Sequence, residues 1–174
     1  MTPKHYPQRG LTLVEAAVVL AVVAITAAIA APGLQRQIEL RRLDGAASQL
    51  AATLQLARNE SIARNRVVRL SLDESLRCVV LHTGPADSCH CTPRGEAECS
   101  GASRPLRTLG ETSGITLQAN ATSLAFDPLH GTVTPTGSFR LTGRNGREIQ
   151  HVVNVMGRVR TCSPGAAVPG YPAC

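Results

Sequence analysis

The chain has 174 residues, a net charge of +6 and an aromatic content of only 2%, which excludes a core built on aromatic rings. Once an apolar N-terminal stretch is set aside, about 140 residues remain, enough for one domain with an aliphatic core. Lys4 is the only lysine, so arginine supplies all the other positive charges of the Lys and Arg type. The excess of arginine over lysine has two explanations. One is codon bias, and the other is phosphate binding, for which the planar guanidinium is suited. Composition alone does not separate the two explanations.

The N-terminal part is a polar segment followed by an apolar one. Lys4 and Arg9 lie in the first ten residues, and Leu11–Ala31 then contains 21 residues with a single charge, Glu15. A helix of this length spans roughly 31 Å, one hydrocarbon thickness. Because cations precede the apolar stretch and none follows until Arg36, we expect a single pass through a membrane, with the N-terminus in the cytoplasm.

An ordinary secretory signal is the alternative interpretation of this segment. It requires a cleavage site of small residues after the apolar core, and Ala28, Ala30 and Ala31 could supply one. Glu15 argues against it, because a carboxylate in hydrocarbon costs up to about 3 kcal/mol and usually marks a functional partner.

Residues 9–15, with the sequence Arg-Gly-Leu-Thr-Leu-Val-Glu, resemble the type IV prepilin cleavage motif. The resemblance implies that prepilin peptidase cuts after Gly10, that the new N-terminal Leu11 is methylated, and that Glu15 is retained. Leu11 departs from the phenylalanine most common at that position. In a fibre, the Glu15 carboxylate would meet the free Leu11 amine of a neighbouring pilin and set the axial stagger between subunits.

Beyond this segment, which we delimit as residues 11–33, we expect a second helix. Pro32-Gly33 predicts a kink or local melting. Apolar residues then recur at steps of three to five and predict an amphipathic helix over residues 34–66, ending near Asn65 and lying on a sheet. These apolar residues are Leu34, Ile38, Leu43, Ala47, Leu50, Leu54, Ala57 and Ile62.

Residues 67–174 show the period of two that is typical of strands, so we predict a β-rich domain and an α+β fold. Seven or eight antiparallel strands are expected. Thr83–Arg104 lacks periodicity and is predicted to be a disulfide-bearing surface loop, and Asn145-Gly146 a type I′ hairpin turn. The expected strands are 67–72, 78–82, 106–109, 115–118, 123–126, 132–134, 138–142 and 147–155.

Six cysteines follow the apolar segment, and an even number in an exported domain predicts disulfides, with 15 possible pairings. The tripeptide Cys89-His90-Cys91 and Cys99 form an alternative set of metal ligands. One residue separates Cys89 from Cys91 instead of the usual two to four, so we predict disulfides, no metal and no cofactor. The disulfide candidates are Cys78, Cys89, Cys91, Cys99, Cys162 and Cys174.

Two further stretches extend the resemblance over nearly the whole chain. Leu54–Asn65 resembles the helix end of the GspH/FimT group of minor pilins and pseudopilins, and Phe126-Asp127-Pro128 with Gly131 and Gly137 resembles its mid-domain pattern. The resemblance implies the type IV pilin fold. In that fold a long N-terminal helix packs on a globular domain of two small antiparallel sheets.

Gly157-Arg158-Val159-Arg160 resembles the FimT branch, members of which bind DNA during natural transformation. In an extended segment Arg158 and Arg160 would share a face and grip successive phosphates. Without the resemblance, such a pair is most often the solvated face of a strand. A disulfide between the last two cysteines would fix the tail beside the pair. Three arginines of the preceding hairpin are expected to extend the patch, namely Arg140, Arg144 and Arg147.

We therefore expect a minor pilin that binds the DNA phosphate backbone weakly and without sequence preference. The resemblance implies that its other partners are pilins of the fibre, prepilin peptidase and, before assembly, the bacterial inner membrane. The domain would then lie in the periplasm and later be displayed on the pilus. The alternatives are a structural or priming minor pilin and a type II secretion pseudopilin. No enzyme is expected, because the histidines are scattered and Asp127, Ser61 and Ser163 have no catalytic partners in the sequence.

Overall fold

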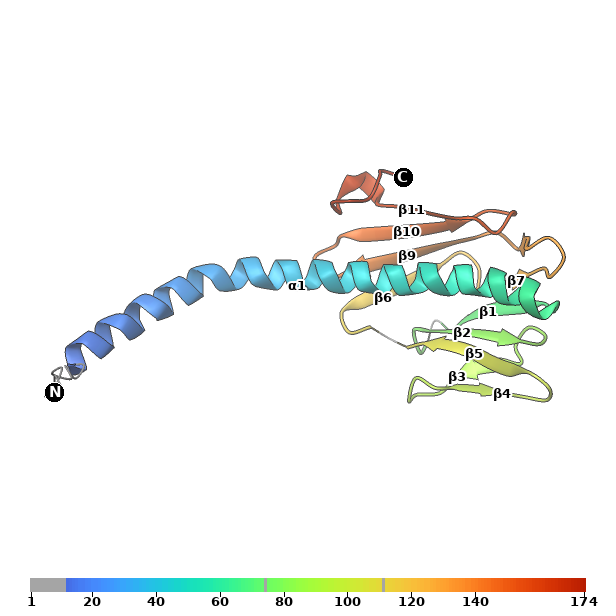
Figure 1. Cartoon of the computed structure of the whole chain (residues 1–174), viewed down its shortest axis with the longest axis horizontal. Helices are drawn as coiled ribbons and strands as arrows, with labels where there is room; N and C mark the ends of the chain where they lie inside the picture. Colours follow the sequence, from blue (N-terminus) through green and yellow to red (C-terminus); the bar gives the residue numbers. More distant parts are fainter. Residues whose placement is uncertain (1–11, 74, 111) are drawn as a thin grey trace, which may run out of the picture. The chain divides into compact units, whose positions relative to one another are not determined.

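The computed structural model describes residues 12–73, 75–110 and 112–174, which contain one long α-helix, eleven β-strands and a short 3-10 helix (Figure 1). The chain divides into two compact units, Met1–Ile38 and Glu39–Cys174. The long helix α1, Leu13–Arg64, contributes to both. The predicted cleavage and methylation positions, Gly10 and Leu11, lie outside the described residues.

In the first unit, α1 is an apolar helix whose side chains are exposed along its length. It begins after Thr12, whose Oγ1 accepts a hydrogen bond from the Glu15 N–H at 3.2 Å, an N-cap. Its length and composition suffice to cross a membrane. The local melting predicted at Pro32-Gly33 is not found, because the helix continues through both residues. Proline removes a single intrahelical bond there, and flanking alanines favour the helical conformation.

In the second unit, one face of α1 enters the core. Its buried residues recur at steps of four and three, so they lie along one stripe. The predicted stripe was too long, since Leu34, Ile38 and Ile62 are 60%, 44% and 49% exposed. Ser61 takes the last inward position instead of Ile62, and its hydroxyl donates to the Arg58 carbonyl at 2.8 Å. The buried apolar residues of the stripe are Leu43, Ala47, Leu50, Leu54 and Ala57.

The helix ends at Arg64, close to the predicted end. Asn65 takes a left-handed conformation with φ of 48°, and its N–H donates to Ile62 O at 3.2 Å. The N–H of Arg66 donates to Ser61 O at 3.1 Å. These two bonds form a Schellman motif, which satisfies carbonyls left open at the helix end and turns the chain into the first strand.

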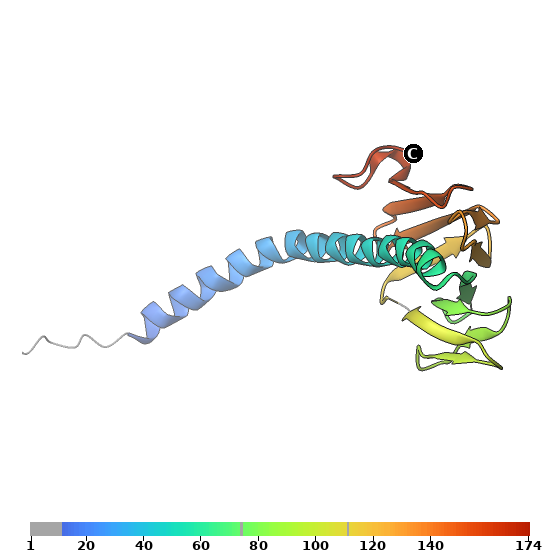
Figure 2. The ribbon, with the colours of Figure 1, turned by 45° about the vertical axis from the view of Figure 1, so that its right-hand side comes forward.

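Two main antiparallel sheets pack against this part of α1, as Figures 1 and 2 show. The first has the order β5-β2-β1-β7-β8, with bounds Arg104–Leu109, Cys78–Thr83, Val68–Asp73, Ser123–Phe126 and Val133–Thr134. The second has the order β11-β10-β9-β6, with bounds Val159–Cys162, Glu148–Val153, Gly137–Gly143 and Ile115–Ala119. This confirms the α+β pilin fold.

A single apolar core joins α1 to both sheets. Phe126 from β7 and Phe139 from β9 are its largest members, and both are fully buried. The other core members are almost all aliphatic, as the composition predicted. Burying each such side chain stabilises the fold by about 1.5–3 kcal/mol. The helix is therefore held through many small contributions, and both sheets depend on it.

Thr83–Arg104, predicted to be an irregular loop, contains a two-stranded sheet. Strand β3, Cys89–Cys91, pairs with β4, Ala97–Cys99. Disulfides join Cys78 to Cys91 and Cys89 to Cys99, so the hairpin is bonded both to β2 and across itself. Three-residue strands are too short to show a period of two, which explains why the pattern did not indicate them.

The Asn145-Gly146 turn has a different type from the one predicted. The Gly146 N–H donates to the Gly143 carbonyl at 2.9 Å, and Gly146 has φ of 73°. A type I′ turn would also require positive φ at Asn145, which is not found. The loop is instead the three-residue hairpin with a left-handed glycine at its end.

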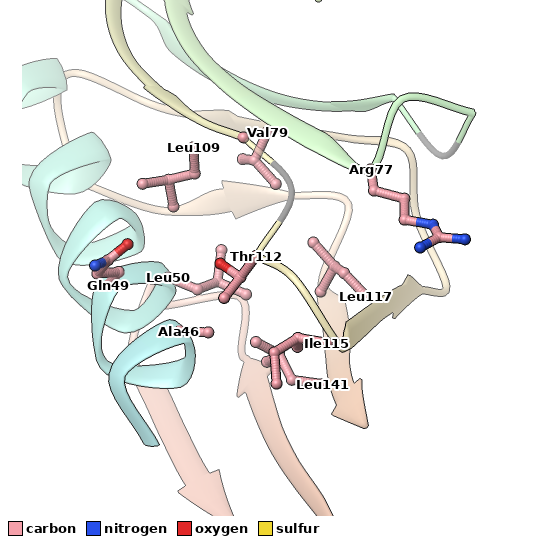
Figure 3. A pocket seen from close by; sticks show the side chains of 11 residues that line it. Ala46, Gln49, Leu50, Arg77, Val79, Leu109, Thr112, Ile115, Leu117 and Leu141 are labelled. Carbon is pink, nitrogen blue, oxygen red and sulfur yellow. The ribbon is translucent and has the colours of Figure 1, made fainter. Parts of the chain in front are cut away.

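A small apolar cavity lies between α1 and the two sheets (Figure 3). Its volume is ≈ 40 Å³, room for about three water molecules. Leu50 of the helix, Val79 of the first sheet and Leu141 of the second line it. A cavity of this size and character is a packing gap, and we assign no ligand to it.

Candidate functional site

The predicted arginine pair lies on the hairpin that joins β10 to β11. Val152 lies opposite Arg160 in the ladder, and Val153 lies opposite Val159. Asn154 closes the turn: its N–H donates to Arg158 O at 3.1 Å, and its Oδ1 accepts from the Arg158 N–H at 3.0 Å. The backbone on both sides of the pair is therefore fixed by hydrogen bonds.

Arg160 lies on β11, and Arg158 lies immediately before the strand; both are exposed. In extended chain, a separation of two residues places the two side chains on the same side. Val159 between them points the other way and packs against the core. Within the described residues, neither guanidinium forms an ion pair with a carboxylate. Two free cations thus project together from a rigid edge of the domain.

Arg140 joins this outer face of the second sheet. It lies on β9 opposite Gln150, which is two residues from Val152 along β10 and therefore on the same side as Arg160. Its Nε lies 3.8 Å from Oε2 of Glu148, so part of its charge is already balanced. Arg140 therefore extends the positively charged surface of Arg158 and Arg160, but it contributes less net charge than either of them.

Arg144 and Arg147 do not join the patch. They lie in the opposite hairpin. Arg147 immediately precedes β10 and is five residues from Val152, a distance of roughly 17 Å in extended chain. Arg144 packs beside Gly114 and lines a narrow cleft with Glu39 on the helix. Strand β10 lies between the two hairpins, so residues close in sequence are held at opposite ends of the sheet.

A disulfide between Cys162 and Cys174 holds the C-terminal tail at the edge of β11. The Ser163 N–H donates to Pro172 O at 2.8 Å. The Tyr171 hydroxyl donates to the Asp44 carboxylate of α1, and burial and this contact raise the pKa of Tyr171 to about 12. The tail is thus tied to both β11 and α1.

Arg58 is a site residue that the sequence pattern does not indicate. Its side chain is half-buried, and its Nε is enclosed without a hydrogen-bond partner. It lies against two left-handed glycines, Gly131 and Gly157, with φ of 63° and 69°. An open cleft of ≈ 430 Å³ adjoins it, and we call this the Arg58 cleft. Its lining residues are Gln55, Arg58, Asn59, Gly157, Arg158 and Val159.

Two histidines are buried in the second unit. His82 Nε2 lies 2.9 Å from Ser71 Oγ, and His151 Nδ1 lies 2.9 Å from Thr161 Oγ1. Burial lowers the pKa of both imidazoles below the ordinary 6.5. Both histidines are therefore neutral, hydrogen-bonded members of the interior at neutral pH.

All six cysteines form disulfides, as predicted from their number. Among the described residues no group of three or more His, Cys, Asp or Glu side chains could hold a metal ion. Glu15 is exposed in the first turn of α1, and no described residue forms an ion pair with it.

Family comparisons match both parts of the chain. The family described as type II transport protein GspH matches residues 46–157, more than half of the sequence. The chain belongs to the GspH family. The prokaryotic N-terminal methylation motif matches residues 6–31. This GspH-family chain is thus a minor type IV pilin or pseudopilin, a class of protein that is processed by prepilin peptidase and assembles with other pilins.

Solved structures with the same fold come from both kinds of machinery. The type IV minor pilin FimU of Pseudomonas aeruginosa PAO1 is 21% identical with a TM-score of 0.55, over 75% of this chain and 95% of that one. The minor pseudopilin EpsH from the type 2 secretion system of Vibrio cholerae is 15% identical with a TM-score of 0.54, over 71% and 98%. No curated protein matches the sequence. These likenesses establish the fold of this GspH-family member and leave its machinery open.

Proposed function

We propose that this GspH-family minor pilin binds DNA without sequence preference and contributes to DNA uptake in natural transformation. The observation that carries the proposal is the pair Arg158 and Arg160, exposed on one side of a hydrogen-bonded hairpin without carboxylate partners among the described residues. The sequence around the pair also resembles the DNA-binding FimT branch.

The geometry suits a phosphate backbone. Residues two apart on a strand have Cα atoms about 6.7 Å apart, so two long side chains can reach neighbouring phosphates of one strand. Guanidinium forks bind phosphate oxygens through paired charge-assisted hydrogen bonds. Such contacts carry no base information, which predicts binding that is indifferent to sequence.

The expected affinity of one subunit is low. Each neutralised phosphate contributes about 0.9 to the slope of log K against log salt, so Arg158 and Arg160 together give a slope near −1.8. Arg140 would bring it to about −2.7 if it exchanges Glu148 for a phosphate. Several subunits on one fibre would raise the effective affinity through multivalency.

Assembly is the second half of the proposal. The free amine of Leu11, made by cleavage after Gly10, would pair with Glu15 of a neighbouring subunit and remove two isolated charges from lipid. The N-terminus would start in the cytoplasm and the second unit in the periplasm, so that the fibre carries the arginine pair outward.

The test is a titration of a short DNA duplex with the purified full chain in nonionic detergent. We compare the wild type with Arg158→Ala/Arg160→Ala and with Arg144→Ala/Arg147→Ala, which removes the same charge at the far end of the sheet. The first variant should lose most of the binding and the second little. If the wild type does not bind at low salt, the DNA proposal is wrong, and a structural or secretion role takes its place.

A further inference from the structure

The Arg58 cleft adjoins the arginine pair from the helix side. Its walls come from two segments distant in sequence, one turn of α1 and the start of β11. Arg158 belongs both to this cleft and to the arginine pair. A ligand that contacts the pair can therefore continue into the cleft without leaving a positively charged surface.

Glycines hold Arg58 in position. A Cβ on Gly157 would lie 2.4 Å from Gly131 O and 3.2 Å from Arg58 Cδ, and a Cβ on Gly131 would lie 2.8 Å from Arg58 Nε. Only glycine leaves room for the arginine between these two loops. Because packing already restricts the side chain, a ligand that binds it has little side-chain entropy to overcome.

The charge of Arg58 is not compensated within the described chain. Its Nε has no hydrogen-bond partner, and no described carboxylate forms an ion pair with the guanidinium. Half-buried charges are ordinarily paired, because an unpaired one is destabilising. Arg158 adds a second positive charge to the same cleft. An anionic ligand would balance the positive charge of this cleft.

We propose that the Arg58 cleft binds one backbone phosphate of DNA, as a third contact beside those of Arg158 and Arg160. This proposal rests on the proposed function and names a new residue for it. A phosphate is favoured over a carboxylate from a neighbouring pilin because the cleft is continuous with the arginine pair. The path of the DNA strand then runs from the outer face of the sheet around the hairpin to the helix.

The most direct test places a carboxylate in the cleft without removing the arginine. Gln55 lines the cleft, is exposed and lies one turn before Arg58, so Gln55→Glu should fold and give Arg58 an internal partner. Gln49→Glu is the matched control, because it makes the same charge change on an exposed position of α1 that lines a different cavity. The readout is duplex binding by the full chain in nonionic detergent.

We expect Gln55→Glu to weaken binding about tenfold and to lower the salt slope by about 0.9, whereas Gln49→Glu should change the affinity by no more than about twofold. Arg58→Gln should repeat the effect of Gln55→Glu. Circular dichroism checks that each variant is folded, and if Arg58→Gln is not, Gln55→Glu decides.

Failure of the cleft proposal can be distinguished from failure of the proposed function. Wild-type affinity and slope in Gln55→Glu, with binding still lost in Arg158→Ala/Arg160→Ala, would overturn the cleft proposal and leave the proposed function intact. Equal losses in Gln55→Glu and Gln49→Glu would also overturn it, since the effect would then be general electrostatics. Loss of fibre incorporation without loss of DNA binding would assign the cleft to a neighbouring pilin instead. Absence of wild-type binding would refute both proposals.

Discussion

Gly157→Ala should destabilise the second unit by more than the ordinary cost of an alanine in a left-handed conformation. The glycine has φ of 69°, a conformation that costs an alanine about 1 kcal/mol. Its Cβ would also lie 2.4 Å from the Gly131 carbonyl oxygen, a backbone atom that cannot rotate away. Separating the two loops would loosen the packing of Arg58, so we expect a total loss of roughly 2–4 kcal/mol.

Gly146→Ala is the control for Gly157→Ala. Gly146 has nearly the same φ, 73°, also lies in a hairpin of the second sheet, and has nothing within 4 Å of its added Cβ. Urea unfolding, monitored by near-ultraviolet circular dichroism, gives the free energy of unfolding of both variants. The control should lose about 1 kcal/mol. Equal losses in the two variants would show that the contact between the hairpin and the Gly131 loop is not required, and would refute the account of how Arg58 is held.

Three further predictions concern other parts of the chain. Burial lowers the pKa of His82 and His151, so below pH 6.5 the unfolded chain binds more protons than the folded one. The free energy of unfolding, measured by urea titration, should therefore be highest above pH 6.5. On acidification it should fall by at most about 1.4 kcal/mol per pH unit for each histidine. A flat stability between pH 7 and pH 5 would contradict this. Replacing Cys162 and Cys174 by serine should cost about 2–3 kcal/mol, measured by the same unfolding; an unchanged midpoint would show that the tail is held without the bond. Glu15→Ala should still insert in the membrane but fail to enter the fibre, measured by fractionation and pilus preparation, and normal incorporation would refute the stagger role.

Much of the fold could be predicted because it depends on local periodicity. The spacing of Leu43, Ala47, Leu50 and Leu54 marks the helix face that enters the core, and alternation marks most strands of the two main sheets. Alternation is recognised only over about four or more residues, and strands β3 and β4 have three each. The β3–β4 hairpin was missed for this reason.

The candidate site was only partly predictable. A separation of two residues in extended chain predicts that Arg158 and Arg160 share a face, and this follows from spacing alone. Arg58 joins them through contacts with Gly131 and Gly157, and these involve segments about 70 to 100 positions away. No local pattern carries such long-range information. Folding also separates residues that are close in sequence. A full strand, β10, lies between Arg147 and the arginine pair.

The salt dependence of DNA binding tests the central claim most directly. The affinity of the full chain for a short duplex is measured at several salt concentrations, for the wild type and for Arg158→Ala/Arg160→Ala. Each lost phosphate contact lowers the slope by about 0.9, so the double variant should show weaker binding and a slope smaller by about 1.8. A folded double variant with the wild-type affinity and slope would contradict the assignment of DNA binding to this hairpin.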